Sequence, residues 1–266
     1  MSKFIKDRLK TINPYIPPVK KSGINLNSNE NPYTAYYNRD ISISTNLYPY
    51  NILKLKEKLS GILTQPLERL NLSCGLDDGI NRIIKTYCET NHDSITIIIP
   101  TFAFYKNAAQ INGIHLNEIP FDKNFNFPLE KLLNLQTKVI FICNPNNPSG
   151  NYIDLKNIEI LCEKYKDQAI IAVDEAYIEF MQDESLSAIN LLDKFDNLIV
   201  MRTMSKAIGL AGIRVGILIS NKEIIEDLNK FTLPYPLPSP TVEIALSALS
   251  DNGMINRRYN INYINF

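Results

Sequence analysis

The stretch Leu198–Ile219, LIVMRTMSKAIGLAGIRVGILI, places one lysine between two apolar runs that have the composition of buried strands. A buried amine loses its proton more easily because desolvation disfavours the charged form, and a neutral amine can attack an aldehyde to form a Schiff base. Near Lys206, the hydroxyls of Thr203 and Ser205 and the guanidinium of Arg214 could hold a phosphate. From these residues alone, a solvent-reaching lysine beside a structural arginine is an equally simple interpretation.

Outward from this stretch, apolar segments alternate with segments of helical periodicity, which predicts an α/β fold. Apolar, β-branched strands favour a mostly parallel sheet covered on both faces, a three-layer α/β/α sandwich, and the first five connections are long enough for helices. The last two strands are separated by about a dozen residues, too few for a helical crossover, so we expect one antiparallel strand. The seven predicted strands span residues 70–73, 94–99, 114–119, 138–143, 169–173, 197–202 and 214–220, and helices are expected at 52–63, 78–90, 102–112, 154–166, 241–249 and from 256 onward.

The composition argues against several classes of protein. The formal net charge is zero and no polybasic run occurs, so nucleic acid and anionic membranes are not expected partners. No apolar stretch reaches the length of a membrane span, and the N-terminus lacks the apolar core of a secretion signal. The four cysteines do not have the spacing of a metal site and fit free thiols in a reducing compartment. We therefore expect a cytoplasmic protein without a metal centre.

Glycine-bearing and aromatic segments follow the first two predicted strands, at the edge where parallel α/β sheets bind ligands. Ser73–Gly79 follows the first strand and opens a helix, whose backbone N–H groups can bind a phosphate. Phe102, after the second strand, offers a face for stacking on a planar ring. An ordinary capped turn and a core phenylalanine remain alternatives for these two features.

Amide, carboxyl and phenol groups follow later strands. Asn147 lies in the turn Asn144–Gly150, and Asp174 follows the fifth strand. A buried acid there needs a cationic partner. A protonated pyridine nitrogen is one candidate and a metal is the other, although only Glu175 is adjacent as a second metal ligand. Together with Tyr177 and the lysine, these groups fit pyridoxal 5′-phosphate, a cofactor that acts as an electron sink.

These segments are similar to those of a known family. The chain resembles the class I/II (fold-type I) aminotransferases, and among them the histidinol-phosphate branch, in the segments NSNENPY (27–33), YP (48–49), NPNNPSG (144–150), VDEAYIEF (173–180) and RTMSKAIGLAGIR (202–214). The resemblance implies the fold of the type I pyridoxal-phosphate-dependent transferases and a homodimer. It also implies a transaminase of histidine biosynthesis, which takes the amino group of L-glutamate and passes it to imidazole-acetol phosphate, giving histidinol phosphate.

The resemblance also implies roles for individual residues. Lys206 would bind the cofactor covalently and move a proton, and Asp174 would pair with the pyridine nitrogen. Asn147 and Tyr177 would bond the ring oxygen, and Phe102, where the family often has tyrosine, would stack on the ring. The groups that would hold the phosphate are Gly75, Leu76 and Asp77 through their backbone, the side chains of Thr203, Ser205 and Arg214, and Tyr48 of the partner subunit.

The same resemblance divides the chain into parts. Residues 1–45 would form an arm that contributes to a small domain, 46–232 the large cofactor-binding domain, and 233–266 a linker and the start of a helix. Relatives continue beyond the position of Phe266 into a small domain that supplies a substrate-binding arginine, so we expect this sequence to lack that domain. Another class I/II aminotransferase, a phosphoamino-acid decarboxylase, or a truncated relative that binds pyridoxal phosphate without turnover remain open as alternatives.

Overall fold

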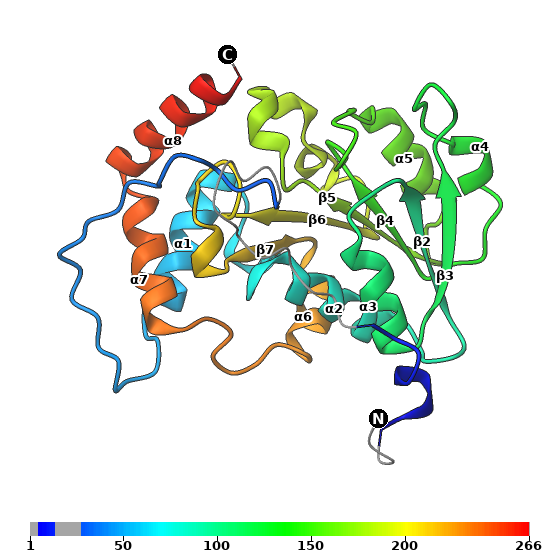
Figure 1. Cartoon of the computed structure of the whole chain (residues 1–266), viewed down its shortest axis with the longest axis horizontal. Helices are drawn as coiled ribbons and strands as arrows, with labels where there is room; N and C mark the ends of the chain where they lie inside the picture. Colours follow the sequence, from blue (N-terminus) through cyan, green and yellow to red (C-terminus); the bar gives the residue numbers. More distant parts are fainter. Residues whose placement is uncertain (1–4, 14–27, 266) are drawn as a thin grey trace.

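A seven-stranded sheet forms the centre of the protein in the computed structural model, which describes residues 5–13 and 28–265 (Figure 1). β7 is antiparallel to both of its neighbours, β1 and β6, and the other strand pairs are parallel, as the sequence predicted. In the order β1-β7-β6-β5-β4-β2-β3, the strands are Leu70–Ser73, Gly216–Ile219, Leu198–Thr203, Ile170–Asp174, Val139–Cys143, Ser94–Ile99 and His115–Pro120.

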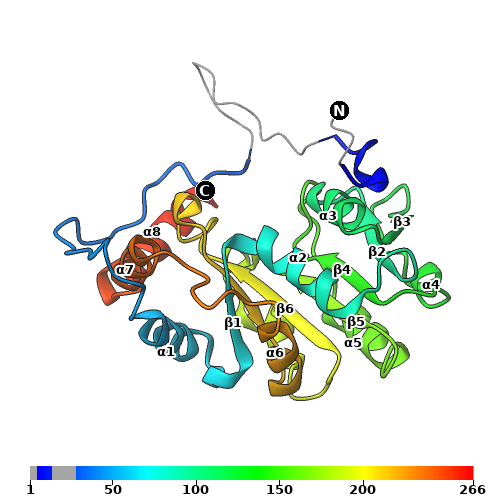
Figure 2. The same ribbon diagram turned by 90° about the horizontal axis from the view of Figure 1, so that it is seen from below.

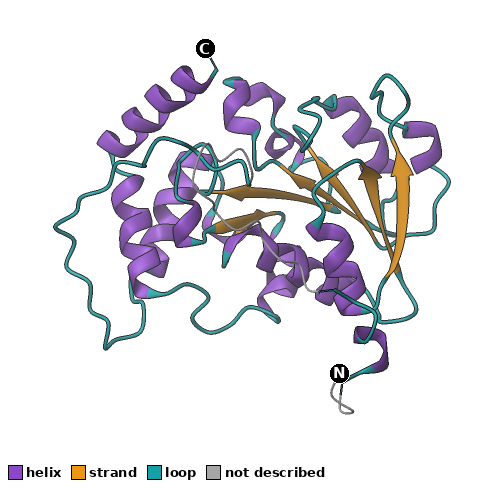
Figure 3. Cartoon of the chain, viewed as in Figure 1, coloured by secondary structure: helices purple, strands orange, loops and turns teal. Residues whose placement is uncertain are grey.

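Helices cover both faces of the sheet and complete the predicted three layers (Figure 3). Successive residues of a strand point to opposite faces, so in β4 the Phe141 side chain joins the core under α2, α3 and α6, whereas Ile140 and Ile142 join the core under α1, α5 and α7. The helices are α1 Ile52–Leu63, α2 Gly75–Tyr87, α3 Phe104–Asn112, α4 Leu129–Leu132, α5 Leu155–Lys164, α6 Lys222–Asn229, α7 Ser239–Ala248 and α8 Asp251–Ile264.

The connection from β5 to β6 differs from the sequence-based expectation. It contains three short 3-10 turns, at Ile178–Met181, Glu184–Leu186 and Ala188–Leu191, where there was room for an α-helix. The side chains of Asp183 and Ser187 each accept a hydrogen bond from a backbone N–H two residues further on. Such local bonds offer the backbone an alternative to helix, which explains why this segment breaks into turns.

The C-terminal helices also begin earlier than predicted. α8 begins at Asp251, five residues before the expected start, because the Ser250 hydroxyl accepts the Gly253 N–H and caps the helix. α7 begins at Ser239 with Pro240 in its first turn, where proline is tolerated. Figure 2 shows α7 beside α1, and Leu237 and Val242 belong to the same buried core as α1. Within the described residues, no helix is long and apolar enough to cross a membrane.

Candidate active site

Most of the predicted site residues, Tyr48 excepted, lie at one edge of the sheet. β4, β5 and β6 are parallel and end at this edge, so Asn147, Asp174 and Lys206 follow or complete neighbouring strands there. β1 runs in the same direction as β6, since both are antiparallel to β7. The turn from β1 into α2, which carries Gly75, therefore opens on the same edge; Figure 2 labels both elements.

Asp174 is a buried carboxyl group at the end of β5. Its Oδ2 accepts a hydrogen bond from the Tyr105 hydroxyl at 2.6 Å, and its Oδ1 accepts one from the Ala176 backbone N–H at 3.0 Å. Burial raises the pKa of Asp174, although both hydrogen bonds act in the opposite direction. The site therefore favours a cationic partner that would stabilise the ionised form of this acid.

Lys206 lies in the loop between β6 and β7 and is partly buried. Its Nζ donates to the backbone oxygens of Ser28 at 2.6 Å and Asn29 at 3.3 Å, and lies 5.7 Å from the centroid of the Tyr177 ring. Desolvation lowers the pKa of Lys206, and the positive charge of Arg214 lowers it further. The amine is consequently neutral at a lower pH than a lysine in water, as the sequence analysis required of a nucleophile.

Asn147 and Tyr177 meet beside the lysine. Asn147 Nδ2 donates to the Tyr177 hydroxyl oxygen at 3.3 Å, and Asn29 Nδ2 donates to the same oxygen at 3.0 Å. Burial raises the pKa of Tyr177 to about 12, so its hydroxyl keeps its proton at neutral pH. Because both of these bonds use the oxygen as acceptor, the hydroxyl proton can be donated to a third oxygen atom.

The start of α2 faces Arg214. Gly75 has a φ of +73°, a conformation that glycine adopts without strain, and a Cβ at this position would collide with the Arg214 guanidinium. The guanidinium is 3.2 Å from the Asp77 carboxylate. The first N–H groups of a helix have no partner within it and carry partial positive charge. The backbone N–H donors at the start of α2 and the Arg214 guanidinium therefore lie close together.

Thr203 and Ser205 lie at the end of β6, beside this helix start. The Thr203 hydroxyl donates to Ser205 Oγ at 3.0 Å, and the Ser205 backbone N–H donates to Thr203 Oγ1 at 3.1 Å. The Leu76 side chain is buried in the core under α2, so its backbone is the part that faces the edge. The Thr203 hydroxyl proton is used within this pair, so the Ser205 hydroxyl and the helix N-terminus are the donors suited to an anion.

The two remaining predicted residues have different surroundings. Phe102 packs edge-on against the Tyr105 ring, with ring centroids 5.6 Å apart and planes at 87°. Tyr48 is 66% exposed and stacks on Tyr235, with centroids 4.1 Å apart and planes at 7°. Phe102 thus belongs to the same cluster as Asp174, whereas the Tyr48 ring lies at the surface against the proline-rich segment that precedes α7.

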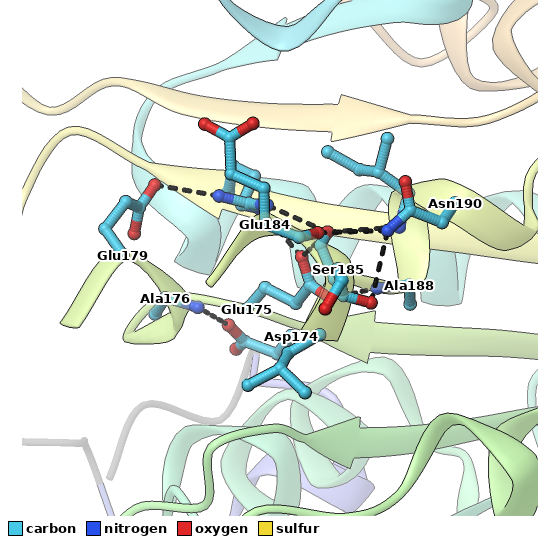
Figure 4. A network of polar contacts seen from close by, with 12 residues as sticks. Asp174, Glu175, Ala176, Glu179, Glu184, Ser185, Ala188 and Asn190 are labelled. Carbon is cyan, nitrogen blue, oxygen red and sulfur yellow. Dashed lines mark hydrogen bonds and ion pairs between the residues drawn. The ribbon is translucent and has the colours of Figure 1, made fainter. Parts of the chain in front are cut away.

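Glu175, the rival metal ligand, is committed to an ion-pair network. Its carboxylate accepts from Arg202 Nε at 2.8 Å, from the Ser187 hydroxyl at 2.7 Å and from the Ala188 N–H at 2.6 Å (Figure 4). Arg202 Nη1 also donates to Glu179 Oε1 at 2.9 Å. Within residues 5–13 and 28–265, no group of three or more His, Cys, Asp or Glu residues has the arrangement of a metal site.

Part of the N-terminal segment crosses the lysine loop. Asn31 Nδ2 donates to the backbone oxygens of Lys206 at 3.1 Å and Ala207 at 3.4 Å, and Asn31 Oδ1 accepts the Tyr33 N–H at 2.9 Å. Further along, the Asn38 N–H donates to the Ser247 hydroxyl of α7 at 2.7 Å. The described part of this arm lies over the candidate site and on α7, and residues 14–27 fall outside the described ranges.

Comparison with known proteins establishes the family. The family model for aminotransferase class I and II matches residues 21–263. The chain belongs to the class I and II aminotransferases. A histidinol-phosphate aminotransferase of Vibrio cholerae is 34% identical to this aminotransferase over 269 residues, which cover 98% of the chain and 76% of that protein. The family predicted from the sequence is thereby confirmed.

Solved structures show the same fold. The histidinol-phosphate aminotransferase of Clostridium acetobutylicum matches with a TM-score of 0.74 at 24% identity, over 82% of this chain and 65% of that one. The enzyme of the same name from Sinorhizobium meliloti, solved in complex with pyridoxal-5′-phosphate, matches with a TM-score of 0.75 at 22% identity, over 83% of this chain and 60% of that one. The aminotransferase described here thus spans less than two thirds of either solved chain.

Three residues of the site were not among those predicted from the sequence. Asn29 and Asn31 lie in the NSNENPY segment, which supported the resemblance but received no role. Tyr105 follows Phe102 by three residues, a spacing typical of two core residues on one helix face. The hydroxyl of Tyr105 could have indicated a contact with a polar site residue, because a buried tyrosine hydroxyl needs a hydrogen-bond partner.

Proposed function

We propose that this aminotransferase transfers an amino group between histidinol phosphate and 2-oxoglutarate, giving imidazole-acetol phosphate and L-glutamate, with the reverse direction serving histidine biosynthesis. The observation that carries the proposal is that Lys206, with its lowered pKa, shares one sheet edge with buried Asp174 and the anion-binding start of α2. The substrate is supported by the 34% identity to a histidinol-phosphate aminotransferase.

The residues at this edge fit pyridoxal 5′-phosphate. The lack of a side chain at Gly75 lets the Arg214 guanidinium approach the start of α2, and the helix N-terminus with the Ser205 hydroxyl, which accepts a bond from Thr203, supplies donors for a doubly charged phosphate. When bound, this cofactor supplies a carbonyl for an amine to attack and a ring that accepts electron density. Gly75, Leu76, Asp77, Thr203, Ser205 and Arg214 are therefore the proposed phosphate-binding residues.

At the other end of the site, Asp174 holds a proton on the ring nitrogen. Its burial makes the isolated carboxylate unfavourable, and a neighbouring pyridinium offsets that cost. Asn147 and Tyr177, which are hydrogen-bonded to each other, would donate to the ring oxygen. Phe102, which packs on Tyr105, would stack on the ring. These groups orient the ring, and the Asp174 charge increases its capacity to withdraw electrons.

Lys206 has two tasks, both at Nζ. It attaches the cofactor covalently, which requires the neutral amine that its environment favours. The same neutral Nζ would take a proton from the substrate carbon and return it to an adjacent atom. Its contacts with the Ser28 and Asn29 carbonyl oxygens must break for either task.

We further propose a cytoplasmic homodimer in which residues 46–232 form the cofactor-binding domain, flanked by the arm of residues 1–45 and the exit segment 233–266. The surface position of Tyr48 supports its assignment as a group that reaches the phosphate of the other subunit. The described cysteines are free thiols, as expected in a reducing compartment.

The test is a half-reaction. Protein loaded with pyridoxal phosphate receives L-glutamate without an acceptor, and we expect stoichiometric release of 2-oxoglutarate. Imidazole-acetol phosphate added next should be converted to histidinol phosphate faster than phenylpyruvate is converted to phenylalanine. Release of carbon dioxide in place of 2-oxoglutarate would indicate a decarboxylase, and preference for phenylpyruvate would indicate an aromatic aminotransferase.

A further inference from the structure

The Tyr105 side chain is held rigidly next to the acid of the site. The residue lies on α3 and is fully buried. Its ring stacks on Phe141 with centroids 5.1 Å apart and planes at 17°, and meets Phe102 edge-on. These contacts hold the ring in place, and its hydroxyl donates to Asp174 Oδ2 at 2.6 Å.

We propose that Tyr105 is a positioning residue, which keeps Asp174 ionised so that the proton of the pair stays on the cofactor's ring nitrogen. The proposal rests on the proposed function, because it concerns the partner of Asp174 in the loaded protein. Tyr105 acts through Asp174 and has a role distinct from that of Phe102, the ring-stacking neighbour on the same segment.

The physical argument is a competition between two bases for one proton. In an acid–pyridine pair, the proton resides on the stronger base, so a weaker carboxylate base leaves it on nitrogen. A hydrogen bond to the charged form stabilises a carboxylate and weakens it as a base. Burial has the opposite effect and is the largest cause of the raised pKa of Asp174. The hydroxyl of Tyr105 therefore offsets part of the effect of burial.

Other groups around Asp174 do not replace this donor. The Ala176 N–H bonds the other carboxylate oxygen, Oδ1. The Asp77 charge raises the pKa of Asp174 and the Lys206 charge lowers it, both without a direct bond. The Cys143 thiol is also close to this pair, and burial raises its pKa well above the usual range, so it stays neutral. The Tyr105 hydroxyl is thus the group that donates to Asp174 Oδ2.

The experiment uses pyridoxal phosphate labelled with ¹⁵N in the ring, bound to the full chain, and compares wild type, Tyr105→Phe and Tyr165→Phe. Tyr165 is the matched control, because it is also a buried tyrosine whose hydroxyl bonds, but to the backbone oxygens of Leu132 and Leu135. The ¹⁵N chemical shift reports whether the ring nitrogen is protonated. The apparent dissociation constant of the cofactor is measured in parallel.

We expect Tyr105→Phe to move the ¹⁵N shift toward the neutral pyridine value and to weaken cofactor binding by roughly tenfold to a hundredfold, the effect of losing a hydrogen bond to a charged group. Tyr165→Phe should leave the shift unchanged. Asp174→Asn should remove the effect of Tyr105→Phe in the double variant, because the two residues act as one unit.

An unchanged shift in Tyr105→Phe, with normal cofactor binding by wild type, would overturn the inference and leave the proposed function intact. Failure of wild type to bind the cofactor would instead overturn both. If Tyr105→Phe does not fold, 3-fluorotyrosine at position 105 keeps the ring and makes the hydroxyl a stronger donor. The ¹⁵N shift should then move toward the pyridinium value relative to wild type, and a move toward the neutral pyridine value would refute the role.

Discussion

Replacing Arg202 with methionine should destabilise the protein strongly, because it leaves the buried Glu175 carboxylate without its cationic partner. Arg202 bonds Glu175 at 2.8 Å and Glu179 at 2.9 Å, and the side chain of Glu175 has no solvent exposure. Removing one member of a buried ion pair costs about 3–5 kcal/mol. For a chain of this size that corresponds to a fall in Tm of roughly 6–20 °C.

The loss should depend on pH in a defined direction. Burial raises the pKa of Glu175 above its ordinary value of 4.5, and the Arg202 charge is the largest cause that opposes the rise. Without Arg202 the folded-state pKa rises further. Between pH 4.5 and that folded-state pKa, the folded chain binds a proton that the unfolded chain has released, so stability falls as pH increases. The variant should therefore be least impaired near pH 4.5 and most impaired above neutrality.

Thermal unfolding followed by circular dichroism between pH 4.5 and 8 measures this loss. Asp193→Asn is the control: it removes an ion pair with Arg69 of similar length, 2.6 Å, in which Asp193 is 85% exposed, and it should cost less than about 1 kcal/mol. Adding Glu175→Leu to Arg202→Met should recover part of the stability. Equal losses in the two single variants would refute the reasoning. The network is relevant to function because it ties together the strand ends that carry Asp174 and the lysine loop.

Three further predictions follow from the site. Gly75→Ala should lower the free energy of unfolding by about 1–2 kcal/mol, because the backbone at this position is left-handed, and should weaken pyridoxal-phosphate binding by displacing Arg214. Gly61→Ala is the control, because its added Cβ meets nothing within 4 Å, and it should have neither effect. Urea unfolding measures the stability and cofactor titration measures the binding. In the cofactor-free protein, Asp174→Asn should remove the loss of stability that wild type shows as pH rises from 3.8 toward the raised pKa of Asp174; parallel pH–Tm curves for the two proteins would contradict this. Asn31→Ala should speed amide hydrogen exchange in residues 28–35, since it removes the bonds that hold this segment to the lysine loop, and unchanged exchange would show that other contacts hold it.

The sheet could be predicted almost completely from the sequence. The central strands β4, β5 and β7 are short apolar runs, because strands buried on both faces need no polar alternation. The edge strand β3 is mostly polar and partly exposed. The antiparallel strand followed from the short connection between β6 and β7. The helix boundaries at Ser250 and the turns after Asp183 were missed, because single capping side chains decide them locally.

The site could be predicted where the topology alone positions a residue. Asn147, Asp174 and Lys206 follow parallel strands, so their meeting is a consequence of strand order. The contacts of Tyr105 and Asn31 depend instead on how α3 and the arm pack. The Asn31–Lys206 bond joins residues 175 positions apart, and the pattern of a polar loop does not indicate such a partner.

The most direct test of the central claim is covalent trapping of the cofactor. The protein is incubated with pyridoxal phosphate, reduced with borohydride and mapped by peptide mass spectrometry, with Lys206→Ala as the control. We predict a phosphopyridoxyl group on the peptide that contains Lys206 and its loss in the variant. Attachment at another lysine, or equal labelling of Lys206→Ala, would contradict the assignment of this edge of the sheet as the active site.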